Sequence, residues 1–230
     1  MTAMTSVAHI RTRSEYTALL ILLVLLSMTS FAQVPDNAAD LEAAQSLAAL
    51  LQETRTLQAD VEQLTLDQDG REIQEFQARL VLEKPDHFSW EILSPYQELL
   101  LTDGERIWRF EQDLEQVSID PFSNDISRIP VLLLNGDARV IAESYTVSSI
   151  SDLVSANTRF ILKPKAPDSL FERLSLSFSG KTLTEMQFED SLGQKTSLTF
   201  NAMRVNESID PAVFHFQMPD GVEVLDNTGL

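Results

Sequence analysis

The chain has 230 residues, with 35 acidic side chains against 17 basic ones and a formal net charge of −18. Nucleic acids are bound through clustered Lys and Arg, so this charge argues against a nucleic-acid partner. The sequence has no Cys, which excludes a disulfide framework, a thiol nucleophile and a Cys-ligated metal.

The N-terminus is typical of a secretory signal peptide. Arg11 and Arg13 precede a short apolar run at 18–26, and Ser30-Phe31-Ala32 follows as a small-x-small cleavage pattern. A membrane span needs roughly 20 apolar residues, and this run is shorter. We therefore expect residues 1–32 to be cleaved and residues 33–230 to form one domain outside the cytoplasm, since this length suits a single core.

The mature chain begins with an amphipathic helix, which Asp36 or Asn37 can cap. Its apolar residues recur at spacings of three and four, in the order Leu41, Ala44, Leu47, Leu50 and Leu51. A stripe of this kind predicts a helix that lies on an apolar surface.

From Leu57 onward the apolar period changes to two, which is typical of β-strands. One strand is predicted from Leu57 toward the turn at Asp67 to Gly70, and a second run after that turn ends at Leu82. Further strands are predicted at about 88–92, 98–102, 107–110, 116–119, 145–149, 159–162, 174–178, 183–189 and 196–203. Most of the links are short and turn-like, for example Asp67-Gln68-Asp69-Gly70. Links of this length permit antiparallel hairpins and exclude crossover helices.

A dense apolar patch between Asp120 and Tyr145 interrupts the strands and ends at Asn135-Gly136, a helix stop. It predicts a short helical insertion. The fold class is therefore mainly β with some α, with one antiparallel sheet of roughly ten or eleven strands. A twisted sheet of this size tends to curl, and we expect the helices to lie over its concave face.

The sequence offers little support for catalysis. It contains no G-x-S-x-G, no H-E-x-x-H, no Gly-rich phosphate loop and no calcium-loop signature. The two His of the mature chain, His87 and His215, lie beside Phe88 and Phe216 in alternating patterns, which favours half-exposed strand positions over a general base. We predict no enzymatic activity, no metal site and no cofactor.

Apolar and aromatic residues share a parity on three adjacent predicted strands. These residues are Phe88, Trp90 and Ile92, then Leu99 and Leu101, then Trp108 and Phe110. Successive strand residues point to opposite faces, so we expect each set to project to one side of the sheet. Such a face is either an ordinary core or the wall of a cavity for an apolar ligand, and large antiparallel barrels do enclose ligand space.

Several motifs in order along the mature chain resemble the LolA family of periplasmic lipoprotein carriers. They are Lys84-Pro85-Asp86-His87-Phe88-Ser89-Trp90, Leu99-Leu100-Leu101-Thr102-Asp103-Gly104, Ile107-Trp108, Ile129-Pro130-Val131-Leu132-Leu133-Leu134-Asn135-Gly136, Leu162-Lys163-Pro164-Lys165, and Phe214-His215-Phe216-Gln217-Met218-Pro219-Asp220-Gly221-Val222-Glu223-Val224.

The resemblance implies an incomplete, half-open antiparallel β-barrel with a helical lid over a hydrophobic cavity that holds the acyl chains of lipoproteins. It implies a monomeric periplasmic chaperone that receives lipoproteins from the inner-membrane complex LolCDE and delivers them to the outer-membrane receptor LolB. The cavity residues predicted on this basis are Phe88, Trp90, Leu99, Leu101, Trp108 and Phe110 from the sheet, with Leu132, Leu133 and Leu134 from the lid.

One position departs from the family pattern. The family usually has an Arg that bonds lid carbonyls and holds the empty cavity shut, whereas this chain has Lys84. Lysine carries three donors but lacks the planar fork of arginine. We expect Lys84 to latch the lid less firmly, although a solvent-facing lysine beside a strand would produce the same sequence.

Two other functions remain open at this level. A periplasmic module similar to the regulator RseB would bind acyl ligands as a signal without delivering them, although residues 33–230 leave little room for the additional domain that this function needs. A lipid-ester hydrolase would require a nucleophile and a base that converge in the cavity. The acidic surface also suggests docking to a basic patch on a receptor.

Overall fold

The computed structural model describes residues 36–122, 133–134, 138–152, 154–167 and 169–229. The chain separates into two units, residues 1–35 and residues 36–230, and all described residues belong to the second unit. The predicted signal peptide, Leu132 and the helix stop at Asn135-Gly136 therefore lie outside the described residues.

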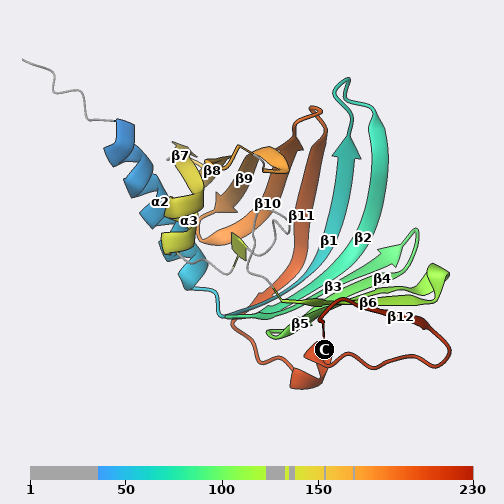
Figure 1. Ribbon diagram of the computed structural model, residues 1–230. Helices are drawn as coiled ribbons and strands as arrows, with labels where there is room; N and C mark the ends of the chain where they lie inside the picture. Colours follow the sequence, from blue (N-terminus) through green and yellow to red (C-terminus); the bar gives the residue numbers. More distant parts are fainter. Residues whose placement is uncertain (1–35, 123–132, 135–137, 153, 168, 230) are drawn as a thin grey trace, which may run out of the picture. The chain divides into compact units, whose positions relative to one another are not determined.

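Twelve strands form one sheet in the order β12-β6-β5-β4-β3-β2-β1-β11-β10-β9-β8-β7 (Figure 1). All neighbouring pairs are antiparallel except β12 and β6. Within the described residues β12 and β7 each pair with one neighbour, so the sheet is open. The strands are β1 (Thr56–Leu66), β2 (Glu72–Glu83), β3 (His87–Ser94), β4 (Glu98–Asp103), β5 (Arg106–Glu111), β6 (Gln116–Pro121), β7 (Tyr145–Asp152), β8 (Asn157–Pro164), β9 (Phe171–Ser179), β10 (Thr182–Asp190), β11 (Lys195–Val205) and β12 (Glu223–Asp226).

The predicted class, a mainly β fold built on one open antiparallel sheet, is confirmed. The predicted strands correspond to β1 through β11, and the short strand β12 was not predicted. The hairpin turns follow from local chemistry, as between β1 and β2. There the Asp67 carboxylate accepts hydrogen bonds from the backbone N–H groups of Asp69 and Arg71, at 2.9 and 2.8 Å, and Gly70 has a φ of +80°. Asp and Gly favour such a turn because one bonds the local backbone and the other tolerates positive φ.

In the part of the chain that the structure describes, two α-helices cover part of the sheet, and we call α2 (Asp36–Gln52) and α3 (Ala138–Ser144) the lid. The lid helices pack on each other and on β7. The buried stripe of α2 consists of Ala43, Ala44, Leu47, Ala48 and Leu51. Leu41, predicted to belong to this stripe, is instead 52% exposed. No helix in the described part of the chain is long and apolar enough to cross a membrane.

The main hydrophobic core lies between the lid and one face of the sheet, which we call the inner face. It contains the lid residues Leu47, Leu51 and Ile141 together with Leu133 and Leu134. The sheet contributes apolar side chains from most of its strands, including Val61, Leu80, Leu82, Phe88, Val147, Leu162, Leu174, Leu176, Met186, Leu198 and Phe200. Strict alternation within each strand brings these residues to the inner face.

A second apolar layer lies on the opposite, outer face of β3 to β6. The strand register pairs Ser89 with Leu101, and Leu101 in turn with Trp108. Directly paired residues project to the same face, so Leu101 and Trp108 lie opposite to Phe88, whose partner is Thr102. The C-terminal segment covers this layer, with Phe214 buried against His87 at a ring-centroid distance of 5.2 Å.

The prediction that the three apolar sets share one face is therefore wrong. Phe88, Trp90 and Ile92 project to the inner face, whereas Leu99, Leu101, Trp108 and Phe110 project to the outer face. The error lies in the β3–β4 register, because alternation fixes the parity within a strand but does not fix how adjacent strands align. Leu100 is the β4 residue that packs on the inner core.

Candidate functional site

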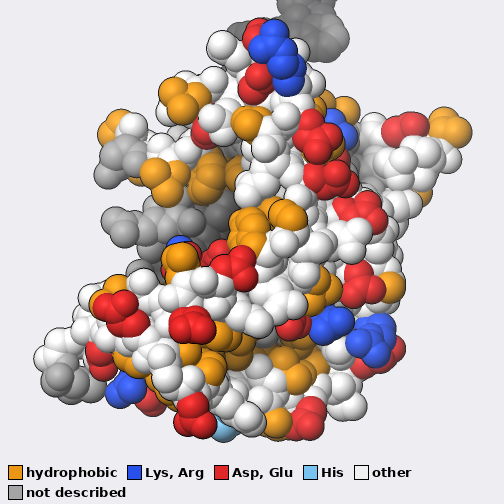
Figure 2. Space-filling view, turned by 90° about the vertical axis from the view of Figure 1, so that its right-hand side faces the viewer, with side chains coloured by type: hydrophobic (Ala, Val, Ile, Leu, Met, Phe, Trp, Pro, Cys, Tyr) orange, Lys and Arg blue, Asp and Glu red, His pale blue; other side chains and the backbone are white. Residues whose placement is uncertain are grey.

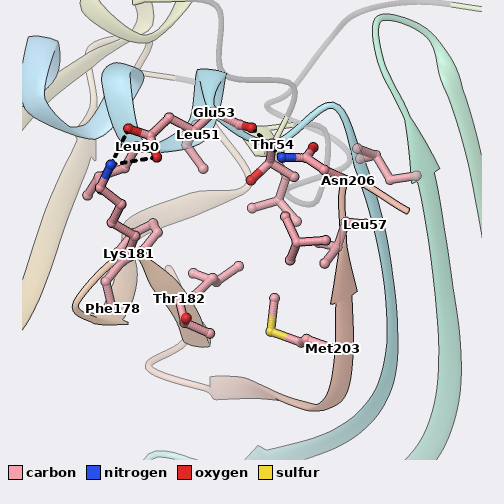
Figure 3. Close-up of a pocket in the computed structure, with 14 residues that line it drawn as sticks. Leu50, Leu51, Glu53, Thr54, Leu57, Phe178, Lys181, Thr182, Met203 and Asn206 are labelled. Carbon is pink, nitrogen blue, oxygen red and sulfur yellow. Dashed lines mark hydrogen bonds and ion pairs between the residues drawn. The ribbon is translucent and has the colours of Figure 1, made fainter. Parts of the chain in front are cut away.

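A pocket of about 220 Å³ lies where the C-terminal end of α2 meets the inner face (Figure 3). Its apolar lining comes from α2, β1, β2, β9, β10 and β11, and from Leu134 in the segment before α3. The apolar side chains are Leu50, Leu51, Leu57, Leu82, Leu134, Phe178, Leu183, Met203 and Val205. Figure 3 shows Phe178, Met203 and Leu57 below the end of the helix. The pocket is thus a gap in the main core between lid and sheet.

Polar groups gather at the rim of this pocket. Lys181 donates to both carboxylate oxygens of Glu53, at 2.6 and 2.9 Å (Figure 3). The Asn206 side chain donates to the Glu53 carbonyl at 2.8 Å and accepts from the backbone N–H of Arg55 at 2.7 Å. These contacts tie the segment after α2 to the β9–β10 hairpin and to the end of β11.

Lys84 also contacts the end of α2. Its ammonium group donates to the backbone carbonyl of Leu51 at 2.6 Å. Carbonyls in the last turn of a helix have no intrahelical partner, and lysine side chains commonly supply one. Lys84 is half-buried, and burial lowers its pKa from 10.5 to about 8. Proximity to the α2 carbonyl therefore comes at the cost of removing the charged amine from water.

Four of the residues predicted to form the cavity and present in the described structure belong to the inner core. Phe88 is buried there, and the half-buried Trp90 packs edge-on against Phe76 at a centroid distance of 6.5 Å. Leu133 and Leu134 are buried in the same core, and Leu134 lines the pocket. The other four sheet residues lie on the outer face, and Leu132 lies outside the described residues.

Most residues that line the pocket were not predicted. Leu57 and Leu82 pair directly across β1 and β2, and Leu183 pairs with Phe178 across β9 and β10. Their alternation placed them in strands, but only the order of the strands in the sheet brings residues so distant in sequence to the same end of α2.

The pocket suits an apolar ligand and is small. Ligand pockets usually enclose about 300–1,000 Å³, more than the 220 Å³ found here. Apart from Thr54, Thr182 and Asn206, its polar lining among described residues is the Glu53–Lys181 pair. The arrangement can shield hydrocarbon from water, and a long chain would fit only after side chains or the lid move.

The family model described as "Outer membrane lipoprotein carrier protein LolA" matches residues 52–217. A Hahella chejuensis protein named outer-membrane lipoprotein carrier protein is 40% identical over 206 residues, which cover 89% of this chain and 97% of that protein. A Chromohalobacter salexigens protein of the same name is 38% identical over 186 residues, 81% of this chain and 88% of that protein.

Among solved structures, an uncharacterized conserved protein from Thermus thermophilus superposes with a TM-score of 0.52 at 12% identity. The alignment covers 80% of this chain and 99% of that one, and it supports the fold alone. The family model and the relatives named above each cover most of the sequence. The chain belongs to the LolA family of outer-membrane lipoprotein carrier proteins.

Proposed function

We propose that this protein is a periplasmic carrier that sequesters the acyl chains of lipoproteins between the inner face and the lid. It would receive them from an inner-membrane LolCDE complex and deliver them to an outer-membrane LolB receptor. The observation that carries the proposal is the continuous apolar inner face, which two short helices cover. The names of the curated relatives support the same cargo.

The energetics explain why a carrier is needed. Each buried CH₂ is worth about 0.8 kcal/mol, so one long acyl chain is worth on the order of 10 kcal/mol. A lipoprotein with three such chains cannot cross water unaided. A carrier must cover hydrocarbon over a much larger area than the lining of the pocket, and the inner face provides that area.

Release is as important as binding, and the lid offers a reason for modest net affinity. Leu47, Leu51 and Ile141 of the lid are buried against the sheet in the empty protein. Acyl chains that enter the core displace these side chains, so the hydrocarbon burial gained is offset by the burial that is lost. This exchange keeps the net affinity for acyl chains low enough that a second binding partner can take the cargo.

The contacts at the end of α2 support a closed resting state. Lys84 bonds the Leu51 carbonyl, and the Glu53–Lys181 and Asn206 contacts hold the following residues. We propose that Lys84 is the latch of the lid. Since burial lowers its pKa, the closed lid imposes a desolvation cost on the charged amine, which makes this latch weak.

The surface charge supports docking to basic partners. Figure 2 shows Asp and Glu side chains spread across one face of the molecule, with few Lys and Arg between them. The formal net charge is −18. Complementary charge accelerates encounter more than it tightens a complex, which suits a carrier that must dissociate. The proposed action is reversible sequestration, with no chemical step.

Direct binding tests the proposal. The purified mature chain is mixed with a triacylated lipopeptide, and the complex is examined by native mass spectrometry and size-exclusion chromatography. We expect a soluble complex of one lipopeptide per protein, and a monoacylated lipopeptide should bind more weakly because it buries fewer CH₂ groups. A folded protein that leaves the triacylated lipopeptide aggregated would contradict the proposal.

A further inference from the structure

A second lysine contacts the lid at α3. Lys165 directly follows the last residue of β8, and its ammonium donates to the backbone carbonyl of Ala142 at 2.6 Å. The backbone N–H of the same residue donates to the carbonyl of Ser144 at 2.9 Å. Ala142 and Ser144 both lie in the last turn of α3. One residue at the end of a strand therefore satisfies two carbonyls at the end of this helix.

This contact has the same form as the one that Lys84 makes with α2. In each case a lysine just after a strand donates its ammonium, at 2.6 Å, to a carbonyl in the last turn of a lid helix. Lys84 follows β2 and bonds Leu51. A cation beside the C-terminal carbonyls of a helix is favourable both as a hydrogen-bond donor and as a charge.

The two contacts lie beside different pockets of the lid. Lys84 bonds Leu51, which lines the pocket at the C-terminal end of α2. Lys165 lines a separate space of about 390 Å³ between α2, α3 and β7, together with Asp40, Leu41 and Ala44 from the first half of α2. The lid is thus attached at two places, one near each end of α2.

The environments of the two lysines differ. Lys84 is half-buried, whereas Lys165 is exposed. The ammonium of Lys165 keeps much of its hydration, so its bond competes with water and holds α3 only modestly. The end of α3 can therefore detach more easily than the end of α2, and it adjoins β7, which is the open edge of the sheet.

We infer that Lys165 is a second positioning residue of the lid, which holds α3 closed as Lys84 holds α2, so that full opening requires both contacts to break. This inference rests on the proposed carrier function. It adds an independent attachment on α3, and it predicts that the space between α3 and β7 opens first.

Hydrogen exchange on the lipid-free mature chain tests the attachment without any cargo. We expect Lys165→Met to accelerate exchange of the α3 amides about three- to fivefold, as befits the loss of one exposed charged contact. The α2 amides of Lys165→Met should change less than about twofold. Lys84→Met should instead accelerate exchange of the α2 amides and leave the α3 amides within about twofold of the parent. Lys165→Arg keeps the charge and donors, so it should restore most of the protection.

Lys163→Met is the matched control, because Lys163 is an exposed lysine on β8 whose side chain makes no hydrogen bond or ion pair with a described residue. Equal α3 exchange in Lys165→Met and Lys163→Met would overturn the inference. Urea unfolding separates positioning from general stability, and we expect the midpoint of Lys165→Met to stay within experimental error of the parent. A large drop in that midpoint would show a merely structural role.

The functional consequence is measured by the rate at which a triacylated lipopeptide dissociates. We expect Lys165→Met to raise this rate about threefold, with no change for Lys163→Met. An unchanged rate with faster α3 exchange would overturn the role of Lys165 in opening. If the parent protein binds no lipopeptide at all, the carrier function fails, whereas the attachment of α3 is judged from exchange alone.

Discussion

Phe216 stacks on Trp108, with ring centroids 6.2 Å apart and ring planes inclined by 10°. Phe110 meets the same Phe216 ring edge-on at 6.3 Å. These contacts belong to the outer face of the sheet, away from the lid. The C-terminal segment therefore has a structural role of its own, which is to cover the second apolar layer on the face opposite to the one where we propose that cargo binds.

Phe216→Ala should lower the free energy of unfolding by about 2 kcal/mol, because it removes half-buried apolar area and two ring contacts. Phe216→Leu keeps most of the apolar area and should cost less than about 1 kcal/mol. Urea unfolding measures both changes. Lipopeptide affinity should not change, and a large loss of affinity in a folded Phe216→Ala protein would contradict the separation of the two faces.

The stability contributed by Lys84 should increase with pH. Burial lowers the pKa of Lys84 to about 8 in the folded protein, against 10.5 ordinarily. Between these values the unfolded chain binds more protons than the folded one, so the free energy of unfolding rises with pH. Below about pH 8 both states are protonated, and the desolvation cost is fully present.

Urea unfolding of the parent and of Lys84→Met at about pH 7 and about pH 9.5 measures this effect. We expect the difference between the two proteins to shift in favour of the parent at the higher pH. By the same linkage, if opening of the lid exposes the amine to water, raising the pH favours the closed lid. A pH-independent difference would show that Lys84 is not the group that titrates.

Filling the pocket should weaken acyl binding. Met203 is half-buried and lines the 220 Å³ pocket, so Met203→Trp places a ring where hydrocarbon is proposed to enter. We expect the dissociation constant for a triacylated lipopeptide to rise about tenfold. Leu99→Trp is the matched control, since Leu99 is half-buried in a groove on the outer face. Equal effects of the two substitutions would contradict the assignment of the cavity to the inner face.

Two contacts at the rim of the pocket should differ in strength. Glu53→Gln should lower the free energy of unfolding by less than about 1 kcal/mol, because the Glu53–Lys181 side chains are 54% and 72% exposed. Asn206→Ala should cost more, about 1–2 kcal/mol, because it removes three side-chain hydrogen bonds, one of them long, and places alanine at a φ of +60°.

Asn206→Gly distinguishes the causes at this position. Glycine accepts the positive φ but makes no side-chain hydrogen bond, so its cost should lie between those of Glu53→Gln and Asn206→Ala. Thermal or urea unfolding ranks the three variants. A Glu53→Gln cost above that of Asn206→Ala would show that the ion pair, despite its exposure, is the stronger attachment.

Much of the fold was predictable because β-strand alternation is a local signal. The β1–β2 hairpin follows from two alternating runs joined by Asp67 to Gly70. Strand β12 was missed because it has four residues, all exposed, and pairs in parallel with β6, more than a hundred positions earlier in the chain. A pairing so distant leaves no pattern within the strand itself.

The candidate site was predictable only in part, for a related reason. Phe88 and Trp90, predicted to line the cavity, lie in the inner core, whereas Leu99 and Trp108, predicted beside them, lie on the outer face. Alternation within a strand does not set the register of β3 with β4, which depends on the turn that joins them. The contact of Lys84 with the lid was suggested by family resemblance alone. Lys165 belongs to one of the family motifs, but no sequence pattern indicated its contact with the lid or the contacts of Asn206, since their partners are fixed by where strands end in three dimensions.

The most direct test of the account is the release of a triacylated lipoprotein from spheroplasts with an active LolCDE complex, on addition of the purified mature chain. The account predicts that the lipoprotein leaves the membrane and is recovered as a soluble one-to-one complex, in an amount that Met203→Trp reduces and Leu99→Trp does not. Lipoprotein that stays in the membrane, with the added chain folded and LolCDE active, would contradict the carrier function.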